Sequence, residues 1–239
     1  MSNEEGTMRI LLVGHGRMGR LVADLAGEYG GEIVGVIDPQ SPLHRGPASD
    51  PAWRGSVDVA IDFSLAEAVP TNVPALAGQG INVVLGTTGW QAHEDELRRV
   101  VESAGTGVVA APNFATGVVF FEAIVGQAAA RFADQPEFGA YLHEAHHVMK
   151  KDAPSGTALM LRGAMQRAGF SRPIDMASTR AGSIPGTHTI GFDGPSDSIT
   201  LTHTARDRSG FARGALVAAR WLRGRRGWFT MHDVLGLGT

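Results

Sequence analysis

Residues 144–157, with the sequence EAHHVMKKDAPSGT, hold the densest group of reactive side chains in the chain. Two adjacent histidines, His146 and His147, are followed by Lys150, Lys151 and Asp152. Imidazole and ammonium groups donate protons and bind anions, which makes such a group useful in acid–base chemistry. A packed core does not need it, so the segment predicts a functional site.

A helix is expected to begin directly after this cluster. Ser155 suits the N-cap position, and Gly156 and Thr157 would be the first helical residues. Backbone N–H groups at such a helix start are unpaired and suit a carboxylate, to which His147 could donate a further hydrogen bond. A helix N-terminus disfavours nearby cations unless an anion joins them, so the upstream lysines favour an anionic ligand. For Lys151 alone, a solvated surface position is the better interpretation.

Residues 143–147 also match H-E-x-x-H, the pattern of zinc hydrolases, with His143 and His147 as ligands. That chemistry needs a helix, whereas the preceding residues alternate like a strand and Pro154 soon interrupts any helix. On a strand, Glu144 and His146 would share one face and the two ligands the other. The sequence therefore predicts no metal site, and chelator-sensitive activity would revive this alternative.

A second motif lies near the start of the chain. Gly14, Gly16 and Gly19 form G-x-G-x-x-G between an expected strand at residues 9–13 and a helix-period segment. The first glycine permits a tight turn, the second lets the backbone approach a pyrophosphate, and the third lets the helix pack on the strand. Asp38 follows the next expected strand, about 20 residues on, as in dinucleotide-binding folds. Together these features predict a dinucleotide site.

Asp38 bears on the choice of cofactor. A carboxylate there accepts hydrogen bonds from ribose hydroxyls and repels a 2′-phosphate. Pro39 follows it, so no arginine stands immediately beside it to hold such a phosphate. The sequence favours NADH, while His44 and Arg45 leave NADPH use open.

Repeated short apolar runs predict the framework that positions these residues. Strands are expected at 9–13, 33–37, 57–63, 81–85 and 107–111, alternating with helices as in a parallel sheet. The loops after the last two strands, residues 86–88 and 111–114, would lie on the ligand-binding edge of that sheet. Ser64 and Glu67 resemble a capping box, but Pro70 and Pro74 predict an irregular helix after it.

The second half of the chain has a different pattern. Helices are expected at residues 118–132, 155–168 and 212–222, and strands at 138–142, 198–203 and 228–235. Residues 172–197 are rich in Gly, Pro, Ser and Thr and are expected to be loop-like, with a strand possible at 187–192.

Composition limits the classes of protein. The 239 residues are 43% hydrophobic and 19% charged with net charge −3, which is typical of a soluble globular protein and argues against nucleic-acid binding. No apolar run approaches the roughly 20 residues that span a bilayer, and residues 1–7 are too polar for a signal peptide. With no cysteine there are no disulfides and no thiol nucleophile. A cytoplasmic protein is expected.

These residues resemble one family, the dihydrodipicolinate reductases (4-hydroxy-tetrahydrodipicolinate reductases) of the diaminopimelate–lysine pathway. Residues 144–158 match the family's signature at every defining position, and supporting matches lie at 14–19, 62–64, 86–89, 112–114 and 180–182. The resemblance spans essentially the whole chain. At Asp38-Pro39 the chain departs from the acidic–basic pair of dual-cofactor relatives.

The resemblance implies an α/β fold of two domains. Residues 1–115 and 212–239 would form a Rossmann-like parallel-sheet domain that binds the dinucleotide. Residues 116–211 would form an α+β mixed-sheet domain that binds substrate and builds a homotetramer.

The resemblance also implies roles for individual residues. His146 would be the proton donor or acceptor and Lys150 the proton donor, while His147 and the helix start at Ser155, Gly156 and Thr157 would hold the carboxylates of a cyclic dicarboxylate. The residues implied to line the nicotinamide cofactor are Gly14, His15, Gly16, Arg17, Met18, Gly19, Asp38, Gly86, Thr87, Thr88, Ala111, Pro112, Asn113 and Phe114.

Two questions stay open at this point. Either His146 or Lys150 could deliver the proton. A non-catalytic, NAD-responsive binding protein on the same fold is the competing hypothesis, and it predicts cofactor binding without turnover.

Overall fold

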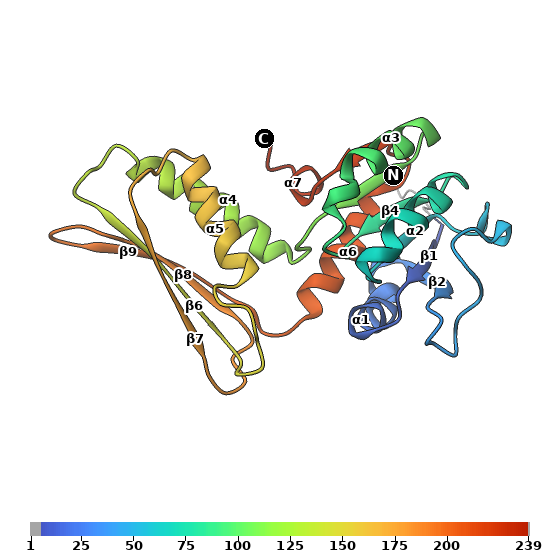
Figure 1. Ribbon diagram of the computed structural model, residues 1–239, viewed down its shortest axis with the longest axis horizontal. Coiled ribbons are helices and arrows are strands. Elements are labelled where there is room, and N and C mark those ends of the chain that lie inside the picture. Colours follow the sequence, from blue (N-terminus) through green and yellow to red (C-terminus); the bar gives the residue numbers. More distant parts are fainter. Residues whose placement is uncertain (1–5, 239) are drawn as a thin grey trace. The chain divides into compact units, whose positions relative to one another are not determined.

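The chain forms two compact units in the computed structural model, which describes residues 6–238 (Figure 1). Unit 1 extends to Thr116 and resumes at Ser209, and unit 2 comprises Gly117–Arg208. The boundaries expected from the sequence, after residue 115 and before residue 212, lie close to these limits. Of the polar start at residues 1–7, only Gly6 and Thr7 are among the described residues.

Unit 1 is built on a six-stranded parallel sheet with the order β10-β5-β4-β3-β1-β2. Its strands are short, apolar and largely buried, as expected when helices cover both faces. The strand order reverses between β1 and β3, and in open α/β sheets ligands bind at the carboxyl edge near such a reversal. The strands are β1 (Met8–Val13), β2 (Gly31–Ile37), β3 (Val59–Asp62), β4 (Asn82–Leu85), β5 (Gly107–Ala110) and β10 (Gly227–Phe229).

Helices pack on this sheet through apolar residues. Val73 and Leu76 of α2 and Leu97 and Val101 of α3 share one buried cluster with the strands. In α6, Gly214 permits close packing, because a Cβ there would overlap the carbonyl oxygen of Phe114. The α-helices are α1 (Arg17–Leu25), α2 (Val69–Ala77), α3 (Glu94–Ala104), α6 (Ser209–Leu222) and α7 (Met231–Val234), and the 3₁₀ turns are η1 (Ala26–Tyr29), η2 (Pro51–Trp53), η3 (Ala66–Ala68) and η4 (Gln91–His93).

Two local predictions for unit 1 are wrong, and one helix of unit 1 was not predicted. Ser64 does not cap a helix, because its hydroxyl donates to Asp62 and the turn η3 begins at Ala66. The expected strand at 228–235 ends at Phe229, since Thr230 and Asp233 form a capping box that starts α7. Helix α3 is absent from the elements expected from the sequence. The irregular helix is confirmed: α2 follows a 3₁₀ turn and contains Pro74.

Unit 2 is a four-stranded mixed sheet with the order β7-β6-β8-β9, in which only β6 and β7 pair in parallel. Apolar residues of α4 and α5, among them Phe121 and Leu161, pack with Leu142, Ile190 and Phe192 of the sheet. In Figure 1 these two helices lie side by side over one face of the sheet. The elements are α4 (Thr116–Phe132), β6 (Gly139–His146), α5 (Gly156–Arg167), β7 (Ile174–Arg180), β8 (Thr187–Asp193) and β9 (Ser198–Thr204).

The expectation of a loop over residues 172–197 is wrong in part. Strand β7 occupies Ile174–Arg180, where polar side chains are mostly exposed because the strand is at the edge of the sheet. Only Ile174 and Met176 of this strand pack against the core, and two apolar residues are too few to predict a strand by alternation. The strand considered possible at 187–192 is confirmed as β8.

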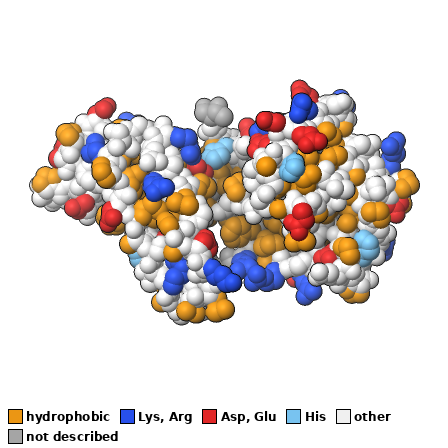
Figure 2. Space-filling view, in the orientation of Figure 1, with side chains coloured by type: hydrophobic (Ala, Val, Ile, Leu, Met, Phe, Trp, Pro, Cys, Tyr) orange, Lys and Arg blue, Asp and Glu red, His pale blue; other side chains and the backbone are white. Residues whose placement is uncertain are grey.

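The surface carries charged side chains of both signs, as the small net charge of the chain leads one to expect. On the face drawn in Figure 2, acidic and basic side chains are scattered over both units. No described helix combines the length and the apolar character needed to cross a membrane.

Candidate active site

The glycine motif forms the turn between β1 and α1. Gly14 has a φ of +90°, and a Cβ at Gly19 would overlap the carbonyl oxygen of Gly14. Gly16 precedes the helix with no atom within 4 Å of where its Cβ would be, and no described side chain caps α1. A helix start that is open and uncapped by a side chain fits a pyrophosphate.

Asp38 lies directly after β2 and is held against this turn. Its Oδ2 accepts a hydrogen bond of 2.7 Å from the backbone N–H of His15, and its Oδ1 accepts one of 2.9 Å from Gln40. The bond from His15 and that from Gln40 hold the pKa of Asp38 below its usual range. An ionised carboxylate therefore lies beside the glycine turn, where a ribose is bound in dinucleotide folds.

The loops after β4 and β5 end at the same carboxyl edge of the sheet. Thr87 is buried, and its hydroxyl donates a 2.8 Å hydrogen bond to Oδ1 of Asp62, at the end of β3. Asn113 accepts a hydrogen bond from the N–H of Ala115, and Phe114 packs edge-on against Phe63. Of the expected residues in these loops, Thr88 and Pro112 are exposed, Gly86 and Asn113 are half-buried, and Thr87, Ala111 and Phe114 are buried.

Asp62, to which the sequence motifs assign no role, joins the loop after β3 to the loop after β4. Its Oδ1 also accepts hydrogen bonds from the N–H and hydroxyl of Ser64, at 2.9 and 2.7 Å. The side chain is fully buried, and burial raises its pKa. The residues at this edge fit a dinucleotide: a glycine turn with an open helix start, an acidic group for a ribose, and loops held by a buried carboxyl.

In unit 2, His146 ends strand β6 and is hydrogen-bonded through Nδ1 to the buried carboxylate of Glu144. Arg180, at the end of β7, donates from Nη1 to Oε2 of Glu144 at 3.0 Å and from Nη2 to Oε1 at 2.7 Å. Burial alone would raise the pKa of Glu144, but hydrogen bonds from Arg180, Ser178 and His146 outweigh it and lower the pKa to about 2. Burial, together with the positive charges of Lys150 and Arg180, lowers the pKa of His146 despite the neighbouring carboxylate of Glu144.

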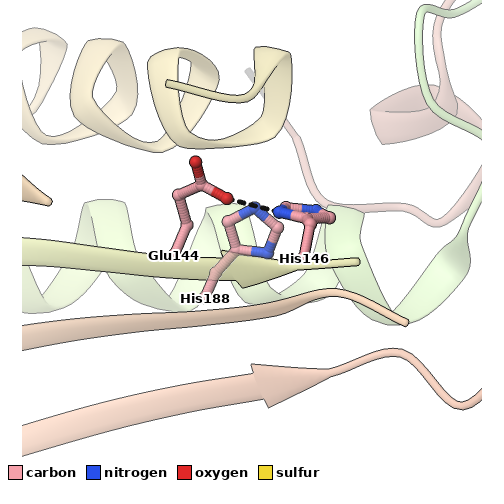
Figure 3. Close-up of side chains that lie close together, drawn as sticks. All are labelled: Glu144, His146 and His188. Atoms are coloured by element: carbon pink, nitrogen blue, oxygen red, sulfur yellow. Dashed lines mark hydrogen bonds and ion pairs between the residues drawn. The ribbon is translucent and has the colours of Figure 1, made fainter. Parts of the chain in front are cut away.

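His188 completes this cluster from strand β8, directly opposite Glu144 in the sheet register. Figure 3 shows the side chains of Glu144, His146 and His188 lying close together. The imidazole rings of His146 and His188 are arranged edge to face, with their centroids 5.1 Å apart. Burial lowers the pKa of His188 to about 4, so this ring is neutral near pH 7.

The same three residues have the spacing of metal ligands, with one donor atom from each within 4.8 Å of the others. Both carboxylate oxygens of Glu144, however, already accept hydrogen bonds from Arg180. The positive charge of Arg180 would also repel a metal cation. A hydrogen-bonded network that handles protons therefore explains the cluster better than a metal site. The zinc-hydrolase interpretation of H-E-x-x-H requires these residues to be helical. His143 instead lies on strand β6, where its ring is hydrogen-bonded to Thr179.

Lys150 lies on the turn that follows β6. Its ammonium group is 2.9 Å from Oδ1 of Asp152, and its backbone N–H donates to the carbonyl of His147. Its side chain is only 24% exposed, whereas Lys151 is exposed. The turn thus orients Lys150 but leaves its neighbour in solvent.

The expected start of helix α5 is confirmed. Ser155 is the N-cap, and its hydroxyl accepts a 3.1 Å hydrogen bond from the N–H of Ala158 and lies 3.0 Å from Nε2 of His188. Gly156 and Thr157 form the exposed and half-buried first residues of the helix. The capping residue Ser155 is therefore buried, while the first turn of the helix reaches the surface.

The structure sorts the predicted site residues into two sets. All fourteen expected cofactor residues belong to unit 1, and His146, His147, Lys150, Ser155, Gly156 and Thr157 belong to unit 2. Glu144, Arg180, His188 and Asp62 had no assigned role from sequence. A role for Glu144 could have been inferred from the expected strand, because Glu144 and His146 lie on the same face of it. No local sequence pattern indicates a role for His188.

Family models match both parts of the chain. Residues 8–114 match "Dihydrodipicolinate reductase, N-terminus" and residues 117–235 match "Dihydrodipicolinate reductase, C-terminus". A 4-hydroxy-tetrahydrodipicolinate reductase of Christiangramia forsetii is 35% identical over 240 residues, covering 95% of this chain and 98% of the relative. One of Stenotrophomonas maltophilia (strain R551-3) is 39% identical over 241 residues, with the same coverage.

Solved structures agree on the fold. A dipicolinate-bound dihydrodipicolinate reductase from Paenisporosarcina sp. TG-14 has a TM-score of 0.83 at 22% identity, covering 95% of this chain and 98% of that one. An amine dehydrogenase from Mycobacterium smegmatis has a TM-score of 0.62 at 13% identity, covering 97% of each chain. With both family models matched along nearly the whole chain, the protein belongs to the dihydrodipicolinate reductase family.

Proposed function

We propose that this protein is a 4-hydroxy-tetrahydrodipicolinate reductase, which reduces the dihydrodipicolinate precursor to tetrahydrodipicolinate in the diaminopimelate route of lysine biosynthesis. Membership of the family makes it an NAD(P)H-dependent oxidoreductase. The observation that carries the proposal is the cluster in unit 2. His146 lies at the end of β6, the largely buried Lys150 lies on the turn that follows, and helix α5 begins directly after that turn.

The cofactor is proposed to bind at the carboxyl edge of the unit 1 sheet. The turn Gly14–Gly19 and the start of α1 would hold the pyrophosphate, and the loops at residues 86–88 and 111–114 would line the rest. Bound NAD(P)H supplies the hydride of the reaction. Asp62 would keep the first of these loops in place through Thr87.

NADH is the proposed preferred cofactor, with NADPH use retained. Asp38 is ionised and lies beside the glycine turn, so it would accept hydrogen bonds from ribose hydroxyls and repel a 2′-phosphate. The nearest arginine along the chain, Arg45, has its guanidinium 3.4 Å from the carbonyl of Val34, with which it forms a hydrogen bond.

The substrate is proposed to bind in unit 2 through its carboxylates. The backbone N–H groups of Gly156 and Thr157 at the start of α5, together with His147, would hold one or both of them. Ser155 would contribute by capping this helix, because its hydroxyl is already engaged with Ala158 and His188.

Hydride addition leaves a carbanion that must be protonated, and His146 and Lys150 are the proposed residues for this step. Lys150 would donate the proton from its ammonium group, which Asp152 orients. His146 would exchange a proton through the nitrogen that does not face Glu144. Positioned acids of this kind contribute on the order of a hundredfold or more in rate.

A homotetramer assembled through unit 2 is part of the proposal. The face of the sheet opposite α4 and α5 carries Tyr141, which is 38% exposed, and threonines that pair across β8 and β9. A sheet face of this kind suits contact with a copy of itself. Sedimentation equilibrium should give four times the chain mass, and a monomer at all concentrations would reject this part.

A cytoplasmic location is also proposed, since the reduced nicotinamide cofactor is supplied there. The whole proposal is tested by a coupled spectrophotometric assay with the freshly made product of the preceding synthase. Oxidation of NADH, faster than that of NADPH, should require this substrate. A protein that binds the cofactor but never oxidises it would be the non-catalytic alternative.

A further inference from the structure

Arg180 connects the two residues to which proton transfer is assigned. Arg180 makes two further hydrogen bonds besides those to Glu144. Its Nη1 donates to the carbonyl of the neighbouring residue, Thr179, and its Nη2 donates at 2.5 Å to the carbonyl of Asp152. Asp152 in turn holds the ammonium group of Lys150. One guanidinium on β7 therefore supports both the carboxylate behind His146 and the turn that carries Lys150.

The bond between Glu144 and His146 fixes which ring nitrogen carries the proton. The carboxylate of Glu144 is fully buried and receives two hydrogen bonds from Arg180, which keep it ionised. An ionised carboxylate only accepts hydrogen bonds, so the Nδ1 of His146 that faces it must be the donor. In a neutral ring this leaves Nε2 without a proton.

A glycine lies beside the other nitrogen of His146. A Cβ built on Gly186 would lie 3.2 Å from Nε2 of His146, so any side chain there would crowd this nitrogen. His146 thus has Nδ1 fixed by Glu144, while its Nε2 lies next to a residue that has no side chain.

We infer that Glu144 and Arg180 are positioning residues that hold the His146 ring in the Nδ1–H tautomer, so that Nε2 is the nitrogen that exchanges a proton with the substrate. The inference rests on the proposed role of His146. The groups that face this ring are Glu144 on its own strand, Arg180 on β7, His188 on β8 and Lys150 from the turn.

The first test measures the tautomer itself in the unaltered protein. Ring-nitrogen NMR shifts should show His146 protonated on Nδ1 and bare on Nε2 at neutral pH, with its signals assigned by their loss in His146→Gln. A ring protonated on Nε2 overturns the inference. Because this measurement needs no altered Glu144, a folding defect cannot obscure it.

The second test compares two matched substitutions in the same unit. Glu144→Gln removes the charge but keeps the size, and kcat should fall on the order of tenfold to a hundredfold while KM for both substrates changes little. The His146 signals should then report a mixture of tautomers. Glu122→Gln is the control, because Glu122 is also buried and paired with an arginine, Arg167, on other elements.

The outcomes separate this inference from the proposed function. If His146→Gln retains full turnover, the proposed role of His146 fails, and the inference fails with it. If His146→Gln loses turnover while Glu144→Gln matches the Glu122→Gln control in kcat and keeps one tautomer, only the inference is overturned. Arg180→Lys, which keeps the charge but cannot form the paired hydrogen bonds, should lower kcat in the same direction as Glu144→Gln.

Discussion

Nε2 of His188 lies 3.0 Å from the hydroxyl of Ser155, so a buried strand residue contacts the cap of the helix that is proposed to bind substrate. The ring of His188 is 5% exposed and neutral. Because the same hydroxyl accepts a hydrogen bond from Ala158, the β8 strand and the start of α5 are held together at one atom. The anion-binding end of the helix is therefore anchored in the core of unit 2.

His188 should make the folded protein less stable in acid. Its pKa is about 4 in the fold against 6.5 in an exposed histidine, so between these values only the unfolded chain takes up the proton. Stability is therefore complete above about pH 6.5 and declines as the pH falls toward 4, by up to ~3 kcal/mol. In His188→Gln this contribution is absent. Urea unfolding of both proteins at several pH values should show their free-energy difference changing across this range, and a constant difference would contradict the assignment.

Lys150 should be required for turnover, and its neighbour should not. Lys150→Gln removes the ammonium group that Asp152 orients, and kcat should fall on the order of a hundredfold. Lys151→Gln is the matched control, since Lys151 is exposed on the same turn. Steady-state kinetics of the two variants decide the point. Equal losses in both would mean that the turn contributes only general positive charge.

Asp62 should support cofactor binding from behind the loops. Asp62→Asn removes a carboxylate that accepts hydrogen bonds from Ser64 and Thr87, and each such buried bond contributes roughly 1 kcal/mol. The Kd for NADH, measured by fluorescence titration, should rise by about tenfold. Asp58→Asn, near the start of the same strand, provides the control. A Kd that stays at the wild-type value would show that the loop is held by other contacts.

Asp38 should determine the cofactor ratio. In Asp38→Asn the repulsion of a 2′-phosphate is lost, and at a partly exposed site this amounts to about 1 kcal/mol. The ratio of kcat/KM for NADPH over NADH should rise about fivefold. Asp24→Asn on the exposed side of α1 serves for comparison. If the ratio does not move, another group governs the preference.

Much of this architecture could be predicted because its sequence patterns are local. The strand–glycine–helix order around Gly14 and Gly16 and the Ser155 cap are each encoded within a few residues, and the structure has them. The fold class followed from alternating apolar runs and from the family resemblance.

What the sequence could not reveal depends on pairing between distant strands. Arg180 reaches Glu144 across 36 positions of the chain, and His188 reaches Ser155 across 33, so no local spacing indicates either contact. Strand β7 was not predicted because only two of its residues, Ile174 and Met176, face the core. The strand predicted at 228–235 ends early for a different reason, because the capping box of Thr230 and Asp233 starts helix α7 within that range.

The central claim is that this protein transfers hydride to the cyclic dicarboxylate with His146 taking part in the proton step. The most direct measurement uses NADH deuterated at its transferable position together with the freshly made synthase product. Each tetrahydrodipicolinate formed should carry one deuterium, and the rate should fall on the order of a hundredfold in His146→Gln. Cofactor binding without any transfer of the label, or an undiminished rate in that variant, would contradict it.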